Sequence, residues 1–317
     1  MTRPFRFAVI TSKAADAHAW RERARRAEAL GYTTLLMPDH FQDQLAPLTA
    51  LATAAAVTDR LAVGTLVFDN DYRHPVVLAK ELATLDLLTG GRVEVGIGAG
   101  WKRSDYDETG MAYDAPGARI DRMVEAIEVM RALWKSTEPV HYAGTHYRID
   151  GAVGTPSPHT SGGPVLCIGG GGRRMLTIAA RLADIVAVNA TMTSGQLDAS
   201  IAVSASPQAF DEKLAWVHDS AVAAGRDGDI ELQCHCPFVQ ITATAEERDA
   251  MLAALAPAFA SSTDDACDIP LTLVGSIDEI VETLLRRRDR WGFTYTVVPD
   301  DAMEAFAPVV AQLAGRT

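Results

Sequence analysis

Cysteine is scarce in this 317-residue sequence, which contains only Cys167, Cys234, Cys236 and Cys267. So few cysteines give no disulfide framework of the kind that small secreted domains use. Cys234 and Cys236 flank His235, but recognised zinc patterns space their paired ligands more widely and need four in all. We therefore predict neither a disulfide framework nor a metal site.

Positive charge and long apolar runs are also lacking. The net charge of -12 disfavours nucleic acid or an anionic membrane as a partner and favours a small ligand. No apolar run approaches the length of a membrane-spanning helix, and Met1 to Ile10 shows no signal-peptide pattern, so we expect a cytoplasmic protein. The composition, 48% hydrophobic and 22% charged, is typical of a globular protein with a sizeable core.

Apolar runs and amphipathic segments alternate along the chain. We predict eight strands, at residues 5–10, 35–37, 61–67, 93–98, 165–168, 185–188, 230–242 and 294–298. Helices are predicted at residues 17–30, 46–57, 75–88, 118–134, 175–182, 207–225, 245–259, 277–291 and 302–313. A hairpin in an insertion at 139–164 and an extra helix in an insertion at 243–275 interrupt the alternation, and 101–117 is predicted to be a polar connection. The pattern predicts an α/β fold, a single (β/α)8 TIM barrel spanning 1–317.

A glycine-rich turn joins the fifth predicted strand to the helix that follows it. Its residues are Gly169, Gly170, Gly171 and Gly172, followed by Arg173 and Arg174. Glycine lets the backbone bend and approach a ligand, and the first amides of a helix have no partner within that helix. With two arginines adding positive charge, the turn is a candidate phosphate site. A flexible turn with solvated arginines is the structural alternative, because this motif alone is weak evidence.

Several motifs together resemble one family. The sequence resembles the bacterial luciferase-like flavin and deazaflavin oxidoreductases at Pro38-Asp39-His40, at residues 63–75, 78–86 and 90–101, and at the glycine turn. The resemblance covers nearly the whole chain, and its most specific part runs from Arg73 to Trp101. Within that superfamily the sequence is most similar to the actinobacterial branch that uses coenzyme F420, a 5-deazaflavin, although FMN-using members share most of these motifs.

The resemblance implies a deazaflavin in the barrel mouth, with its phosphate at the glycine turn. That is where the argument from helix amides also places an anion. A polar side chain after the fourth strand would meet the ring, and a bulge with a non-prolyl cis peptide bond, matched to Thr65-Leu66, would lie behind it. The residues that the resemblance places on the cofactor are Asp39, His40, Thr65, Leu66, Ser104, Gly169, Gly170, Gly171, Gly172 and Arg173.

The implied chemistry is hydride transfer between F420 and a small organic molecule, such as an alcohol or ketone, an imine or an enone. The protein then has to position the substrate and move one proton. His40 is the candidate for that proton, because an unperturbed imidazole has a pKa of about 6.5, and Asp39 is the expected partner that orients it. Weaker candidates for substrate contact are Asn189, which could instead stabilise a turn, and the pair Trp101 and Tyr106, which could line a substrate pocket or pack the loop against the barrel rim. The resemblance leaves a homodimer open.

Three alternatives remain. An FMN-dependent monooxygenase that uses reduced flavin and oxygen would keep the fold, and so would a non-catalytic flavin-binding protein. An aldolase-type barrel would need a lysine at a strand end, but Lys80 is expected in a helix and Lys102 in a loop.

The basic run 286–290 is interpreted as the solvated face of its helix.

Overall fold

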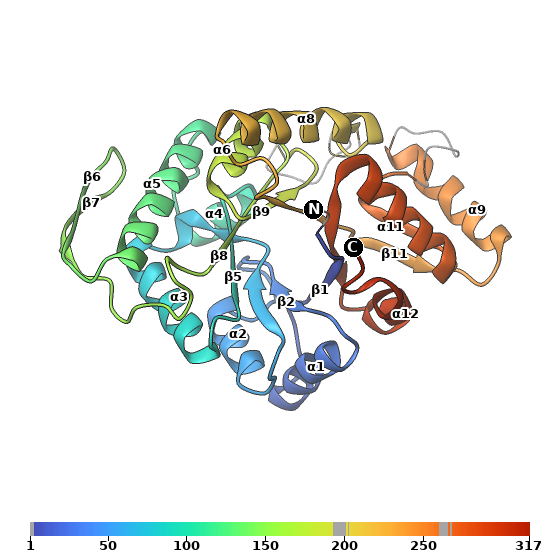
Figure 1. The fold of residues 1–317 in the computed structure, drawn as a ribbon, viewed down its shortest axis with the longest axis horizontal. Coiled ribbons are helices and arrows are strands. Elements are labelled where there is room, and N and C mark those ends of the chain that lie inside the picture. The colour runs from blue at the N-terminus through green and yellow to red at the C-terminus, as the bar shows by residue number, and fades with distance from the viewer. Residues whose placement is uncertain (1–2, 193–200, 202, 260–265, 267) are drawn as a thin grey trace. The chain divides into compact units, whose positions relative to one another are not determined.

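The computed structural model describes residues 3–192, 201, 203–259, 266 and 268–317. Figure 1 shows its strands and helices in chain order. Contacts within the chain divide it into two compact units. Unit 1 comprises Met1–Thr11, Arg26–Leu35 and Ile168–Thr317, and unit 2 comprises Ser12–Arg25 and Leu36–Cys167.

Parallel strands form the central sheet. These strands are β1 (Arg6–Ile10), β2 (Thr34–Met37), β3 (Ala62–Thr65), β4 (Phe68–Asp69), β5 (Val93–Gly98), β8 (Val165–Gly170), β9 (Ile185–Val188), β10 (Glu231–His235) and β13 (Phe293–Pro299). Their order is β3-β2-β1-β13-β10-β9-β8-β5-β4, and β3 also pairs with β5, so the sheet closes on itself. Because β3 and β4 both pair with β5 and follow one another, they share one position. The predicted (β/α)8 barrel is confirmed.

Helices follow the strands and begin at the expected signals. The α-helices are α1 (Ala17–Ala29), α2 (Pro47–Ala55), α3 (Pro75–Thr89), α4 (Arg103–Thr109), α5 (Pro116–Lys135), α6 (Arg173–Leu182), α8 (Pro207–Ala223), α9 (Ala245–Leu255), α11 (Ile277–Trp291) and α12 (Met303–Leu313), with 3-10 turns η1 (Asn70–Tyr72) and η2 (Ala256–Phe259). Ser206 caps α8, and Ser276 forms the expected capping box with Glu279 on α11. None of the described helices has the length and apolar character that crossing a bilayer requires.

The core explains why the apolar runs of the sequence are continuous. Strands β2, β5 and β9 are buried at every residue, as expected for parallel strands covered on both faces. In unit 1, Phe7 of β1 packs edge-to-face on Phe306 of α12, with ring centroids 5.7 Å apart. In unit 2, Trp134 of α5 donates its indole N–H to the carbonyl of Ala79 on α3 (3.0 Å).

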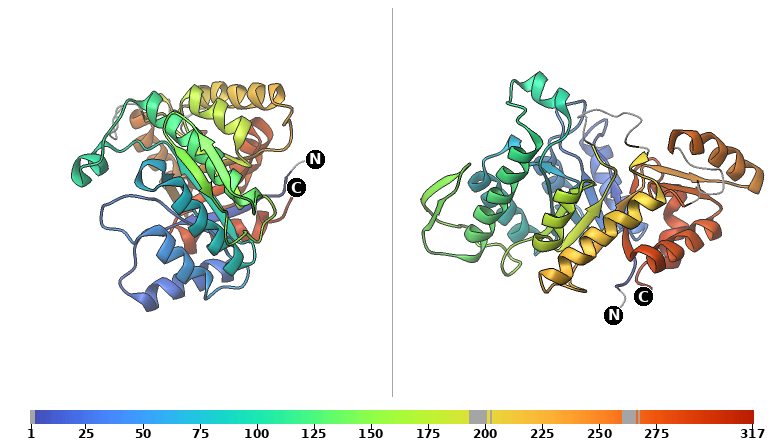
Figure 2. Two further views of the ribbon diagram at one scale, coloured as in Figure 1. Left: turned by 90° about the vertical axis from the view of Figure 1, so that its left-hand side faces the viewer. Right: turned by 90° about the horizontal axis from the view of Figure 1, so that it is seen from above.

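The insertion before β8 contains the expected hairpin. Strands β6 (Val140–Ala143) and β7 (Arg148–Ala152) pair antiparallel, and they form the separate ribbon beside α5 in Figure 2. Glu125 of α5 accepts hydrogen bonds from the amides of Thr145, His146 and Tyr147 at the hairpin tip. These bonds tie the tip to the helix.

The third predicted strand, 61–67, is wrong at its C-terminal end. It breaks after Thr65 and resumes as β4, and the peptide bond between Leu66 and Val67 is cis. The cis bond therefore lies one residue beyond the position matched from the resemblance. Close packing accompanies this break, because a Cβ on Gly96 of β5 would lie 1.9 Å from the carbonyl oxygen of Thr65.

The predicted seventh strand, 230–242, is two strands. It ends as a barrel strand at His235, and β11 (Phe238–Ile241) pairs in a separate small parallel sheet with β12 (Thr272–Gly275). Pro237 lies between the two strands and has no N–H for a ladder bond, which accounts for the interruption. The extra helix of this insertion is present as α9, and Cys267 lies outside the described residues.

The polar connection predicted at 101–117 contains a helix, α4. This helix is only seven residues long and has no apolar stripe, so hydrophobic periodicity could not detect it. Two of its polar residues, Asp105 and Tyr106, are fully buried. The burial of Asp105 and Tyr106 becomes important at the candidate site.

The interpretation of 286–290 as a solvated face is wrong for Arg287. Its side chain is buried, and its guanidinium donates to the carbonyl oxygens of Ile269 (2.7 Å), Pro270 (3.1 Å) and Thr272 (2.7 Å). It also lies 3.9 Å from the sulfur of Cys236. Arg287 therefore joins α11 to the segment that leads into β12.

We expect Arg287→Leu to lower the free energy of unfolding by about 3 kcal/mol, because buried carbonyl oxygens would lose a charged donor. Arg286→Leu is the matched control, since the neighbouring side chain is 54% exposed, and its cost should stay below about 1 kcal/mol. Denaturant unfolding of both variants measures the difference. Equal losses would contradict the role assigned to Arg287.

Candidate functional site

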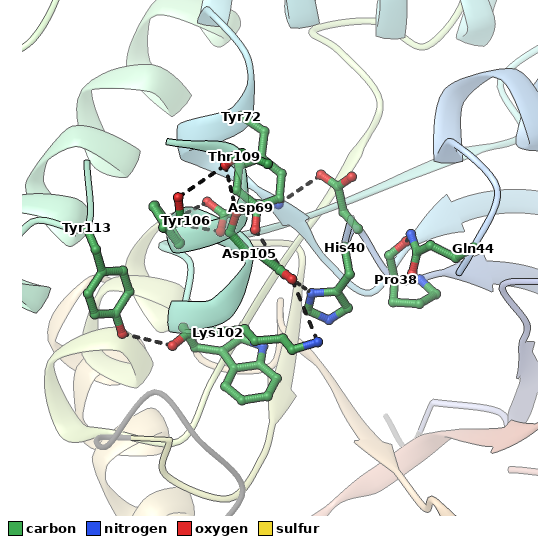
Figure 3. Close-up of polar contacts among 12 residues, drawn as sticks. Pro38, His40, Gln44, Asp69, Tyr72, Lys102, Asp105, Tyr106, Thr109 and Tyr113 are labelled. Atoms are coloured by element: carbon green, nitrogen blue, oxygen red, sulfur yellow. Dashed lines mark hydrogen bonds and ion pairs between the residues drawn. The ribbon is translucent and has the colours of Figure 1, made fainter. Parts of the chain in front are cut away.

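His40 lies just after β2 and is held by a carboxylate from α4. Its Nδ1 is 2.6 Å from Oδ2 of Asp105, which is fully buried, whereas the imidazole is 24% exposed. The hydroxyl of Tyr72 donates to the same oxygen (3.2 Å), and Nζ of Lys102 lies 3.7 Å from Oδ1. Figure 3 shows the His40 and Lys102 side chains both directed at Asp105.

The His40–Asp105 contact sets the proton arrangement of the imidazole. A carboxylate accepts only, so His40 donates its Nδ1 proton to Asp105, and the neutral ring keeps its lone pair on Nε2. When Nε2 gains a proton, the carboxylate stabilises the imidazolium. This is the arrangement that a general acid and base needs.

The expected pairing of His40 with Asp39 is not the one in the structure. Asp39 is buried and accepts two hydrogen bonds from Arg73, at 2.5 and 3.1 Å. It also accepts a hydrogen bond from the amide of Asp69 (3.2 Å). Asp39 therefore holds the η1 segment in place through Arg73 and Asp69, and Asp105 is the partner of the imidazole.

The other ring-side candidates lie on neighbouring segments of unit 2. The indole of Trp101 stands edge-on to the His40 ring, with centroids 5.9 Å apart, and Ser104 is half-buried in the first turn of α4. Thr65 donates its hydroxyl to the carbonyl of Gly96 (2.8 Å), and the amide of Leu66 donates to Met37 (2.8 Å). The segment that leads into the Leu66–Val67 cis bond is thus bonded to β5 through the Thr65 side chain and to β2 through the Leu66 amide.

The glycine turn belongs to unit 1, and its four glycines differ in their surroundings. Gly169 and Gly170 end β8, and α6 starts at Arg173. A Cβ on Gly171 would lie 2.2 Å from the carbonyl oxygen of Ala190, whereas a Cβ on Gly172 would meet nothing within 4 Å. Gly172 is the N-cap of α6 and has no side chain to cap it, so its end of the turn is where an anion can approach the helix amides.

Asn189 is joined to the glycine turn through its backbone. Its amide donates to the carbonyl of Gly170 (2.9 Å), and its carbonyl accepts from Nζ of Lys213 (2.8 Å). The same Nζ donates to the carbonyl of Ser204 (2.5 Å). Lys213 is buried, and its desolvation lowers the pKa of the ammonium group to about 8.

Sequence reasoning missed Lys213 and Asp105 for different reasons. Lys213 falls on the buried stripe of α8 with Phe210 and Val217, so a charged residue at apolar helical spacing was a usable signal. Asp105 lay inside the segment predicted to have no helix. Tyr106 next to it is fully buried, so it packs α4 and does not line a substrate pocket.

A closed barrel with polar side chains at the carboxyl ends of its strands is the architecture in which (β/α)8 enzymes place their active sites. A family model described as luciferase-like monooxygenase matches residues 1–309. The chain therefore belongs to the luciferase-like monooxygenase family, and it is an oxidoreductase.

Named relatives of this chain use two kinds of cofactor. The chain is 31% identical over 212 residues to the F420-dependent glucose-6-phosphate dehydrogenase of Microbacterium testaceum. The matched stretch covers 64% of this chain and 58% of that protein. It is 30% identical over 181 residues to the FMNH(2)-dependent dimethylsulfone monooxygenase of Pseudomonas fluorescens. That match covers 55% of this chain and 49% of the monooxygenase. The coenzyme F420-dependent tetrahydromethanopterin reductase of Methanopyrus kandleri shares the fold, with a TM-score of 0.76, 19% identity and 99% of both chains covered.

Two glycine substitutions should separate packing from ligand approach in the turn. Gly171→Ala places a methyl group against the backbone of Ala190, so we expect a loss of about 3 kcal/mol in unfolding free energy. Gly172→Ala has open space and should cost no more than about 1 kcal/mol, the usual cost of alanine at an N-cap. Denaturant unfolding measures both, and a Gly172→Ala loss as large as that of Gly171→Ala would refute the distinction.

The tautomer of His40 should depend on Asp105. In Asp105→Asn the amide can also donate to Nδ1, so we expect the ring to lose its single tautomer with the proton on Nδ1. Nitrogen NMR of the imidazole measures this directly. Asp107→Asn is the control, because Asp107 lies on the same helix, exposed and paired with Arg103. An unchanged tautomer in Asp105→Asn would show that Asp105 does not control the ring.

Proposed function

We propose that this protein is a coenzyme F420-dependent oxidoreductase that transfers hydride between the deazaflavin and a small organic substrate, such as an alcohol or ketone, an imine or an enone. The observation that carries the proposal is the imidazole of His40 held by the buried carboxylate of Asp105. A reaction that moves hydride also needs one proton moved, and this pair is suited to that task. The F420-dependent relative supports the choice of cofactor.

The residues present fit an anionic cofactor at the glycine turn. The N-cap of α6 has no side-chain cap, Gly172 leaves space for a ligand, and exposed Arg173 adds a positive charge. Gly169, Gly170, Gly171, Gly172 and Arg173 would hold the phosphate. Asp39, His40, Thr65, Leu66 and Ser104 would hold the ring.

When bound, F420 supplies a ring carbon that accepts or donates hydride. His40 takes the proton of an alcohol on Nε2 during oxidation and returns it during reduction. Asp105 holds the Nδ1 proton and stabilises the positive ring. Such proton transfer contributes about 100- to 10,000-fold to the rate of an enzyme.

Substrate contact is proposed for Trp101 and, more weakly, for Asn189. The edge-on contact of Trp101 with His40 places an apolar ring beside the proton-transfer group and favours an organic substrate of low charge. Both backbone groups of Asn189 are engaged, by Gly170 and Lys213, and these bonds fix the strand end that carries its side chain.

An FMN-dependent monooxygenase is the second candidate function. The FMNH(2)-dependent relative favours it, since its identity to this chain is close to that of the F420-dependent one. The two candidates predict different behaviour of the purified protein. The first predicts F420 binding, whereas the second predicts FMN binding and oxygen uptake with reduced FMN.

The test titrates the protein separately with F420 and FMN and then follows F420 reduction with a panel of secondary alcohols. We expect F420 binding and, with a substrate, a fall in turnover of about 100- to 10,000-fold in His40→Ala with cofactor binding retained. His141→Ala is the control, because His141 also pairs with an aspartate but lies exposed in the hairpin. FMN binding with oxygen uptake and no F420 binding would overturn the proposal, and near-normal turnover of His40→Ala would remove His40 from the mechanism.

A further inference from the structure

A second group of buried carboxylates surrounds the hydroxyl of Tyr106. This hydroxyl lies 2.9 and 3.1 Å from the two carboxyl oxygens of Asp69, at the end of β4. It also lies 3.0 Å from Oδ2 of Asp71 in η1. Asp69 and Tyr106 are both buried, and Figure 3 shows the phenol of Tyr106 beside Asp69.

The group is one hydrogen short if both carboxylates are charged. A tyrosine hydroxyl has a single hydrogen and can donate it to only one of two acceptors. Asp71 is the charged acceptor, because Arg122 of α5 binds both of its oxygens, at 2.7 and 2.9 Å. Asp69 would then turn a carboxylate oxygen toward the lone pairs of Tyr106, unless Asp69 carries a proton and donates it.

A proton on Asp69 satisfies every contact in the group. Oδ2 of Asp69 donates to Tyr106, which donates to Asp71, while Oδ1 of Asp69 still accepts from the amide of Asp71 (2.9 Å). The pKa of the Asp69 carboxyl is raised to about 6, and burial is the largest cause. The charges of Asp71 and Asp39 add to the rise, whereas the amide of Asp71 and the hydroxyl of Tyr106 oppose it.

The groups that face Asp69 come from every segment packed against it. They are Asp71 and Tyr72 of η1, Tyr106 of α4, Asp39 after β2 with its partner Arg73, and two arginines of α5, Arg122 through Asp71 and Arg119 over the Tyr106 ring (5.9 Å to its centroid). Arg73 and Arg122 are bound to the other two carboxylates, and Arg119 donates to the carbonyl of Gly100. Asp69 is therefore the carboxyl group of this set that is neutralised by a proton and not by an arginine.

The position of α4 depends on this group. A Cβ on Gly100 would lie 1.9 Å from the hydroxyl of Tyr106 and 2.5 Å from Oδ2 of Asp69, so the segment after β5 lies directly on the two side chains. Trp101 follows immediately, and Asp105 precedes Tyr106 on α4. A change in the Asp69–Tyr106 bond would therefore move the carboxylate that holds His40.

We propose that Asp69 is a positioning residue that carries a proton in the folded chain, donates it in a hydrogen bond to Tyr106, and thereby holds α4 where Asp105 meets His40. The step is a simple acid–base exchange with water, with no change of oxidation state. Its effect on turnover rests on the proposed function, whereas the protonation itself does not.

Asp69→Asn imitates the protonated state, because the amide N–H can donate to Tyr106 while the amide oxygen accepts from Asp71. We expect wild type to show an infrared carboxylic-acid band that is lost on titration near pH 6 and is missing from Asp69→Asn. Asp107→Asn, on the exposed side of α4, should keep the band. Absence of the titrating band in wild type, or its persistence in Asp69→Asn, would overturn the proposal.

Stability provides an independent measurement with a defined sign. A folded pKa of about 6 lies above the ordinary aspartate pKa of 3.8, so protonation stabilises the folded chain, and this contribution is lost as the pH rises from 3.8 to 6. Between pH 5 and pH 8 the unfolding constant of wild type should therefore rise about 10-fold relative to that of Asp69→Asn. A ratio independent of pH would refute the proposal.

Turnover measured against pH distinguishes a failure of this proposal from a failure of the proposed function. With F420 and a substrate, Asp69→Asn should keep its turnover at pH 8, whereas turnover of wild type should fall as Asp69 loses its proton. An identical pH profile for both proteins would overturn the positioning role. If the infrared and stability results are as expected but F420 does not bind, the proposed function fails and the protonation of Asp69 stands.

Discussion

The need to pair buried carboxylates determines how the segments at the strand ends of unit 2 are arranged. Four carboxyl groups of the described residues lie there with little or no contact with water, and an unpaired carboxylate in such surroundings costs several kcal/mol. They are Asp39, Asp69, Asp71 and Asp105. Each has different partners: Arg73 for Asp39, the hydroxyl of Tyr106 for Asp69, Arg122 for Asp71, and His40 with Lys102 and Tyr72 for Asp105. These pairings hold the short helix α4 in its position.

This arrangement gives two neighbouring aspartates distinct chemistry. The carboxylate oxygens of Asp39 accept hydrogen bonds from Arg73 and from the amide of Asp69, so Asp39 links these segments structurally. Asp105 has neutral Tyr72 and the more distant ammonium of Lys102 around it, so its charge remains directed at His40. An imidazole facing such a carboxylate can gain and lose a proton on Nε2 without moving.

Local patterns predicted most of the fold, since strand and helix alternate through most of the chain and features such as Ser276 with Glu279 mark where helices start. The errors arose where distant contacts decide the local structure. Arg287 looks like a solvated residue of a basic run, but carbonyl oxygens from another segment bury it. The resemblance pointed to His40, yet its partner Asp105 lies 65 positions away, beyond the reach of any local pattern.

The glycine turn shows how one motif combines two physical requirements. Gly171 is required by the backbone of Ala190 and Gly170 by the side chain of Met175, so neither needs a ligand to explain it. Of Gly170, Gly171 and Gly172, only Gly172 has open space where a side chain would stand, and it also occupies the N-cap position of α6. An anion that meets this turn therefore has a narrow approach, over Gly172 toward the first amides of α6. The bonds from Asn189 to Gly170 and from Lys213 to Asn189 keep that approach in place by fixing the strand end behind it.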